Sequence, residues 1–337
     1  MAFTSYSGAT SRLYVSSAIE ATAGVVTTLN KSFYPNDGWD IKRPQAEEVD
    51  DVVSGYDDAF SRTVTGYSAE GNISMPLHPD VAAWAFKMLF GAAPTSALVS
   101  PSSTVYEHTQ NAWTHPPATF TAQVKRSTVA TYLEKYGGMG LKSLSIKSGK
   151  GKIGIDLPLV GMGVMTLGDA EASATPAAPV TEAYLIGVSS QLKIAGTLVN
   201  QGVLQMGWSL SIDPAHTLID AAGATDGTQQ RFDFAPKGQR KYSADVELVV
   251  ESRAHLDDII AQTYRTWEFL CNGPIIDTPN SIRSLVAIKF TKARPIVAPE
   301  IPLAKGLFLQ KLKIEANVDT ATGYAIITRV RNLTASY

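Results

Sequence analysis

The stretch from Ala69 to Gly91, AEGNISMPLHPDVAAWAFKMLFG, determines how the chain is organised. Residues 71–77 predict a short strand that ends among prolines, and Pro79 suits the first turn of a helix that follows directly. Gly91 can adopt the left-handed conformation that closes such a helix. The apolar stripe of this predicted packing helix consists of Val81, Trp84, Ala85, Met88 and Leu89.

The second half of the chain repeats this order. Hydrophobic and polar residues alternate over 244–251, which is the period-2 pattern of a half-buried strand. Ser252 is suited to the N-cap of a second packing helix. The apolar stripe of that helix consists of Leu256, Ile259, Ile260 and Tyr264. A strand followed by a single helix therefore occurs twice in a chain that otherwise reads as strands.

Alternating patterns predict strands in most of the remaining chain. They include a hairpin over 144–159, a two-sided strand over 204–212, and a hairpin in which 324–331 pairs back onto 311–316. The segment 92–117 is rich in Ser, Thr and Pro and predicts a surface excursion. These patterns predict a mainly β fold built of sandwich or barrel modules, each with one flanking α-helix.

The order of elements recurs at an offset of roughly 165–175 residues, which is the size of a domain. The segment 166–182, TLGDAEASATPAAPVTE, is small, polar and proline-bearing, as linkers are. We therefore expect a tandem duplication, with one domain at 1–165, a linker at 166–182 and a second domain at 183–337.

Composition excludes several classes of protein. The 337 residues are 45% hydrophobic and 18% charged, which is typical of globular chains, and the formal charge of −2 gives no basic footprint for tight nucleic-acid binding. Cys271 is the only cysteine, so the chain contains no internal disulfide. The first residues lack a secretory signal pattern, and no apolar run approaches the ~20 residues of a spanning helix. We expect a soluble protein made in a cytoplasm, without membrane insertion.

No motif predicts catalysis, a cofactor or a metal site. Residues 66–70, GYSAE, have Glu where a nucleophile elbow needs its second Gly, and residues 148–152, SGKGK, lack the earlier Gly of a phosphate loop. The five histidines have no metal-ligand spacing. Trp84 and Trp208 are expected in the core, where large aromatic residues bury most area.

The most distinctive charged segment covers Arg43 to Gly66, where a long connection inside a compact domain usually has a function. Interspersed valines and aromatic residues argue against simple disorder, so we expect a projecting loop or β-hairpin that orders against a partner. A solvated acidic face and a charge-complementary contact with a neighbouring subunit are the two alternatives. The candidate contact residues are Glu47, Glu48, Asp50, Asp51, Tyr56, Asp57 and Asp58.

The run GNISMPLHPDVAAWAFKMLFGA (71–92), followed by TFTAQVKR (119–126) and YGGMGLKSLSIKSGKGKIGIDLPLVG (136–161), resembles the tail tube protein family of long, flexible-tailed bacteriophages. The second half, with SADVELVVESRAHLDDII (243–260) and LQKLKIEANVDTATGYAIITRVRN (309–332), is similar to a further copy of the same domain. The resemblance covers most of the chain and consists of an order of elements without an invariant motif.

This resemblance implies a β-sandwich whose copies join their sheets around a ring with a β-barrel lumen. It implies a virion tail protein, assembled in the cytoplasm of a bacterial host, whose rings stack through long loops. A duplicated chain would form a homotrimeric, pseudo-hexameric ring. The implied partners are the tape measure protein, tail terminator and baseplate proteins, and double-stranded DNA that passes through the lumen during ejection without specific binding.

Two other functions are compatible with the sequence. The first is another virion component on the same fold, such as a tail completion ring or a baseplate hub. The second is a carbohydrate-binding β-sandwich module, in which Trp113, Tyr132 and Tyr136 would form an exposed aromatic face.

Overall fold

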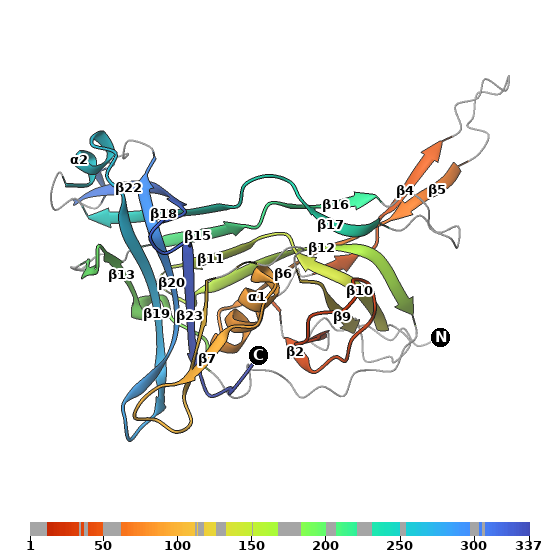
Figure 1. Ribbon diagram of the computed structural model, residues 1–337, viewed down its shortest axis with the longest axis horizontal. Coiled ribbons are helices and arrows are strands. Elements are labelled where there is room, and N and C mark those ends of the chain that lie inside the picture. Colours follow the sequence, from red (N-terminus) through yellow and green to blue (C-terminus); the bar gives the residue numbers. More distant parts are fainter. Residues whose placement is uncertain are drawn as a thin grey trace.

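The computed structural model describes residues 12–33, 35–36, 40–49, 62–111, 113, 118–125, 133–149, 151–167, 183–199, 207–220, 231–249, 254–296, 303–304 and 307–337. Within them the chain is mainly β, as predicted, with two α-helices (Figure 1). The helices are α1 (Pro79–Phe90) and α2 (Ala254–Ile260).

The strands fall into two sequence halves. Those of the first half are β1 (Arg12–Val15), β2 (Lys31–Phe33), β3 (Asp40–Lys42), β4 (Gln45–Val49), β5 (Arg62–Tyr67), β6 (Ala69–Pro76), β7 (Thr95–Leu98), β8 (Tyr106–Gln110), β9 (Phe120–Lys125), β10 (Leu133–Leu141), β11 (Leu144–Ser148) and β12 (Gly154–Leu167). Those of the second half are β13 (Ser190–Ile194), β14 (Thr197–Leu198), β15 (Trp208–Asp213), β16 (His216–Asp220), β17 (Arg231–Pro236), β18 (Lys241–Val249), β19 (Arg265–Asp277), β20 (Ile282–Pro295), β21 (Leu303–Ala304), β22 (Leu307–Asn317) and β23 (Ile326–Asn332).

Seven strands from both halves form one antiparallel sheet, which we call the long sheet. Its order is β3–β6–β12–β11–β15–β18–β22. The halves meet where β11 pairs with β15, in a register that runs from Leu144 opposite Ile212 to Ser148 opposite Trp208. In Figure 1 these strands cross the upper part of the molecule and α1 lies beneath them.

Further strands branch from β12, within the long sheet, and from β22, at one end of it. On β12, the chain β10–β9–β1–β2 continues the hydrogen bonding of the first half. The second branch begins with β20, which pairs along one part of its length with β22 and along another part with β23. Strand β20 also pairs with β19, and the sheet continues from β19 to β13 and β14. The apolar core lies between the long sheet and these branches, because the buried residues of both form one contiguous cluster.

The pairings of the two halves follow the same sequence. The first half has β1–β2, β1–β9, β9–β10, β10–β12, β6–β12 and β3–β6. The second half has β13–β14, β13–β19, β19–β20, β20–β22, β18–β22 and β15–β18. Each half also has a separate two-stranded hairpin, β4–β5 and β16–β17 respectively, and each has its helix after the long-sheet strand β6 or β18.

Helix α1 differs from the expected flanking helix because it lies inside the molecule. Pro79 is in its first turn, and Gly91 at φ 75° donates its N–H to the carbonyl of Lys87 at 2.9 Å. Every residue from 79 to 90 is buried, including Asp80 and Lys87. The helix contacts β10 of its own half and β20 and β23 of the other. The predicted apolar stripe of α1 faces only part of the core, and strands of the second half cover the remaining sides of the helix.

The charged residues of α1 have close hydrogen-bonding partners. Lys31 donates to the Asp80 carboxylate at 2.7 Å, and Lys87 donates to the Ser17 carbonyl at 2.7 Å. Burial, and after it the nearby Lys31 ammonium, lowers the pKa of Lys87. These contacts satisfy charges that would otherwise oppose the packing of the helix between the two halves.

Two sequence expectations about connections are wrong. The strand β23 does not pair back onto β22; it pairs with β20 and with β8, because β20 is long enough to pair with both. The segment 92–117 contains the hairpin β7–β8, and β8 is built into the sheet with His108 buried. The glycines at 137–138 form a bulge within β10, where Gly138 has φ 67° and donates its N–H to the Glu20 carboxylate.

Helix α2 is shorter than the predicted stripe requires. Ile259 packs against the core, but Ile260 is the last helical residue and is 67% exposed, contrary to its assignment as a packing residue. The reason is that, in the part of the chain that the structure describes, the main contact of this seven-residue helix is with β20, so one narrow face is covered. The side chain of Leu256 and most of the predicted linker lie outside the described residues; Thr166 and Leu167 belong to β12.

Candidate assembly surfaces

The long sheet buries one face and presents a polar face on the other. Along β15, Trp208, Leu210 and Ile212 are buried while the alternate residues are polar. Buried residues alternate in the same way along the other six strands, and their outward residues are mostly polar, with Pro158 and Val160 of β12 among the exceptions. The acidic residues of the polar face are Asp40, Glu70, Asp156, Asp213, Asp245, Glu247 and Glu315, and the basic ones are Lys42, Lys147, Lys241, Lys311 and Lys313. This face is therefore densely charged but close to neutral, with a small acidic excess.

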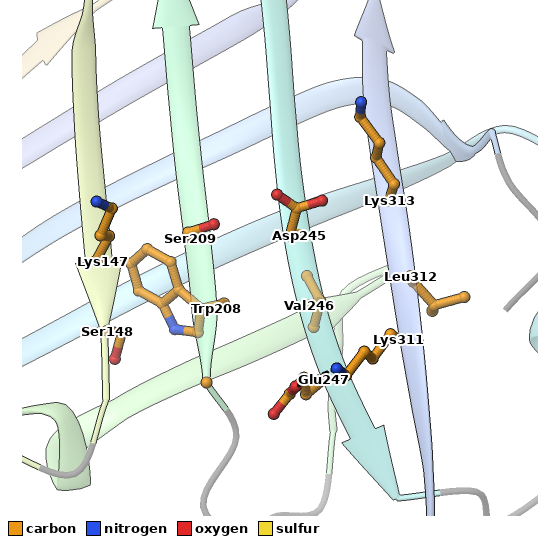
Figure 2. Close-up of a pocket in the computed structure, with 11 residues that line it drawn as sticks. Lys147, Ser148, Trp208, Ser209, Asp245, Val246, Glu247, Lys311, Leu312 and Lys313 are labelled. Atoms are coloured by element: carbon orange, nitrogen blue, oxygen red, sulfur yellow. Dashed lines mark ion pairs between the residues drawn. The ribbon is translucent and has the colours of Figure 1, made fainter. Parts of the chain in front are cut away.

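A hollow of about 530 Å³ lies on the polar face, over β11, β15, β18 and β22. Figure 2 shows Lys147, Asp245, Glu247, Lys311 and Lys313 projecting from neighbouring strands around it. Lys311 and Glu247 form an ion pair at 3.7 Å, with side chains 51% and 44% exposed. The charged groups belong to adjacent strands and compensate one another in solvent, so the hollow resembles a curved sheet surface more than an enclosed ligand site.

The described residues hold no arrangement that predicts catalysis or metal binding. No group of three His, Cys, Asp or Glu that could bind a metal occurs among them. Cys271 is buried in β19, and burial raises the pKa of its thiol, so its reactive thiolate form is suppressed. His108 also lies in the interior, where it hydrogen-bonds to Asn332 at 3.1 Å and to Ser96 at 2.7 Å.

The aromatic residues considered for sugar binding do not form an exposed face. Tyr136 is fully buried in β10. Trp113 stacks on Phe90 of α1, with ring centroids 4.3 Å apart, and Arg240 covers it at 4.6 Å. Tyr132 lies outside the described residues. The geometry of Tyr136 and Trp113 therefore contradicts the carbohydrate-binding interpretation, since stacking on sugars needs open ring faces.

The long sheet ends in strand edges. Strand β3 pairs with β6 and with no other strand among the described residues. At the opposite end, β22 pairs with β18, and the two-residue strand β21 pairs with β22. The unpaired backbone N–H and C=O groups of such strand edges are either protected or paired with another chain. Within this chain, the first half is joined to the second half by the antiparallel pairing of β11 with β15.

The hairpin β4–β5 projects from the body, and its base is anchored (Figure 1). The Arg43 guanidinium donates to the Gly163 carbonyl at 2.6 Å and lies over the Tyr67 ring at 3.8 Å. Gly163 has φ 79°, and a Cβ there would lie 2.6 Å from the Tyr67 carbonyl oxygen, so only glycine fits. The direction of the hairpin is thus fixed at its root by β12.

The hairpin β16–β17 lies against the first half instead of projecting freely. Phe234 of β17 is 4% exposed and sits over Gly140 of β10. A Cβ at Gly140 would be 2.7 Å from the Phe234 ring, so the absence of a side chain there makes room for the ring. Sequence reasoning missed this contact and the Arg43 anchor, because neither has a periodic signal.

The structure places the predicted contact residues unequally. Glu47 and Glu48 lie on β4, where the backbone is described and the side chains are not. Asp50, Asp51, Tyr56, Asp57 and Asp58 lie outside the described residues. The helix residues Val81, Trp84 and Met88 are fully buried, and the Trp84 ring meets Phe33 and Phe120 edge-on with centroids 5.0 Å away.

Comparison with known proteins identifies one family. The family model described as phage tail tube protein matches residues 10–301, which is most of the chain. No curated protein matches the sequence. Among the described residues, neither helix has the length and apolar character that crossing a membrane requires.

Proposed function

The chain belongs to the phage tail tube protein family, and from this premise we propose that it is the major tail tube subunit, three copies of which close into each ring. Family membership makes it a structural component of the virion tail that assembles into a tube. In the proposed ring, each chain contributes two copies of a duplicated domain, so that six similar units surround the lumen. The rings stack to form the channel for the tape measure protein and for DNA ejection.

The junction of β11 with β15 carries the trimer proposal. This ladder joins the first half to the second through five register pairs, and the pairings of the two halves follow the same sequence. If the second half of one protomer joins the first half of the next in the same way, the β21 edge meets the β3 edge. Repeating the join closes a circle and covers both edges, as closed symmetry requires.

The polar face of the long sheet suits the wall of the lumen. Its charges are interspersed, with a small acidic excess, and those in the hollow are largely compensated by neighbours. A strongly basic wall would bind phosphates and release counterions, which would hold DNA in place. A nearly neutral wall lets a polyanion pass. Tail terminator and baseplate proteins would contact the two ends of the stacked rings.

The segment from Glu47 to Asp58 is proposed to make contacts between rings. Its support is the projecting hairpin β4–β5, whose root is held by Arg43. Deleting 47–58 should leave rings or monomers that do not form filaments, as measured by light scattering and negative-stain microscopy. A second variant keeps the length of the segment and replaces its acidic residues by Asn or Gln. This variant distinguishes the effect of the negative charges from the effect of the segment's length. Filaments of unchanged length and yield from the deletion variant would refute this role.

A further inference from the structure

The contact between β16–β17 and the first half provides a template for a contact between chains. Val160 on β12 pairs with Gly140 on β10, and Phe234 of the second-half hairpin rests over that glycine. Val160 follows Leu159, the first residue of β12 that pairs with both β6 and β10, through Gly71 and Leu141 respectively. The docking position thus lies one residue beyond the point where β10 begins to pair with β12 opposite β6.

The second half has a corresponding position with different chemistry. Ile314 is the first residue of β22 that pairs on both sides, with Ala244 of β18 and Pro295 of β20. The next residue, Glu315, pairs with Arg294. Arg294 therefore stands where Gly140 stands in the first half. Its guanidinium lies 5.3 Å from the centre of the Tyr264 ring.

The position in the second half is cationic. The Lys292 ammonium lies 5.0 Å from the same Tyr264 ring, so two cations share one aromatic support. Glu315 is the acidic residue in direct register with Arg294, and it offsets one of the two charges. This platform does not suit an apolar ring such as Phe234, but it suits a carboxylate.

The hairpin of the first half supplies that carboxylate. Counting from the base of each hairpin, the third pair is Leu218 with Phe234 in β16–β17 and Glu47 with Val64 in β4–β5. Val64 therefore corresponds to Phe234, and Glu47 lies directly opposite Val64 across the hairpin. We propose that β4–β5 of one protomer lies across β20 and β22 of its neighbour in the same ring, with Glu47 beside Arg294. This inference rests on the proposed ring, and it adds a specific contact within the ring to the stacking role of the segment beyond Glu48.

Cysteine cross-linking tests this contact on the full-length protein. The variant Glu47→Cys with Arg294→Cys should give disulfide-linked dimers and trimers when assembled protein is oxidised. The matched control pairs Glu47→Cys with Arg283→Cys, because Arg283 is exposed at the opposite end of β20. The native Cys271 is buried and does not interfere. Rings or tubes that form without the specific cross-link would overturn the contact and leave the proposed function standing.

Charge reversal provides a second readout. Glu47→Arg or Arg294→Glu alone should lower the yield of rings about tenfold at a given protein concentration, because like charges face each other across the interface. The double variant Glu47→Arg/Arg294→Glu should restore most of the yield. Failure of the double variant to recover, with the circular dichroism spectrum unchanged, contradicts the pairing. Absence of rings from the wild-type protein at every concentration would overturn both this contact and the trimeric ring.

Discussion

Ile146 of β11 and Leu210 of β15 are register partners, and through them the backbone of the first half passes directly into that of the second. Both side chains are buried and belong to the same core. The polar face opposite them continues without interruption from Ser145 to Ser211. One chain therefore contains a complete join between its two halves, which is the element that closure of the proposed ring would repeat.

The burial of Trp84 predicts its contribution to stability. Replacing Trp84 by Ala should lower the free energy of unfolding by about 3–5 kcal/mol, because the change leaves a large cavity between Phe33 and Phe120. It also removes the indole hydrogen bond to the Ser16 carbonyl. Urea denaturation measures the effect. Val25→Ala, at a side chain 59% exposed, is the control and should change stability by less than about 0.5 kcal/mol.

The ion pair of Lys31 with Asp80 predicts an asymmetric response to mutation. The side chains are 14% and 8% exposed, so Lys31→Met should destabilise the fold by about 3 kcal/mol by leaving a buried carboxylate without its cation. Adding Asp80→Leu should recover part of that loss, since neither charge of this pair then remains. A double variant less stable than the sum of the two single changes would contradict this explanation.

His108 predicts a loss of stability in mild acid. Burial lowers the pKa of His108 below its ordinary value of 6.5, against smaller opposing effects of Asn332, Thr334, Asp80 and Glu107. Between the folded and unfolded pKa values the unfolded chain binds more protons, so stability present above pH 6.5 declines as the pH falls. Urea denaturation at pH 8 and pH 5 should show this decline, and His108→Gln should reduce it. An equal decline in the variant would assign the effect to other groups.

Cys271 predicts a thiol that is inert in the folded protein. It is buried, and its raised pKa keeps it protonated. A chromogenic disulfide reagent at pH 8 should therefore react only after denaturant is added. Rapid reaction under native conditions would show that β19 opens locally and would require replacing Cys271 by Ser in the cross-linking experiment.

Local sequence patterns predicted the strands well because the alternation in each strand is determined by the residues of that strand alone. The alternation around Leu210, the hairpin at 144–159 and the helix that contains Trp84 all follow from which side chains avoid water. The pattern could not identify the partner of each strand. The join of β8 to β23, and that of β11 to β15, depend on residues sixty or more positions apart.

The errors have the same origin. Tyr324 to Arg331 alternates as a hairpin arm would, but its partner is chosen by the length of β20. Ile260 matches a helical stripe, yet the described part of the chain leaves it largely exposed. In the proposed ring, such residues at the edge of a protomer lie next to another copy, which a single sequence does not specify.

The most direct test of the central claim is electron microscopy of the purified, concentrated protein, with class averages down the axis of any assembly. The account predicts tubes or rings in which three chains present six similar units around a lumen lined by the polar face of the long sheet. A protein that stays monomeric at every concentration, or rings whose chain number is not three, would contradict it.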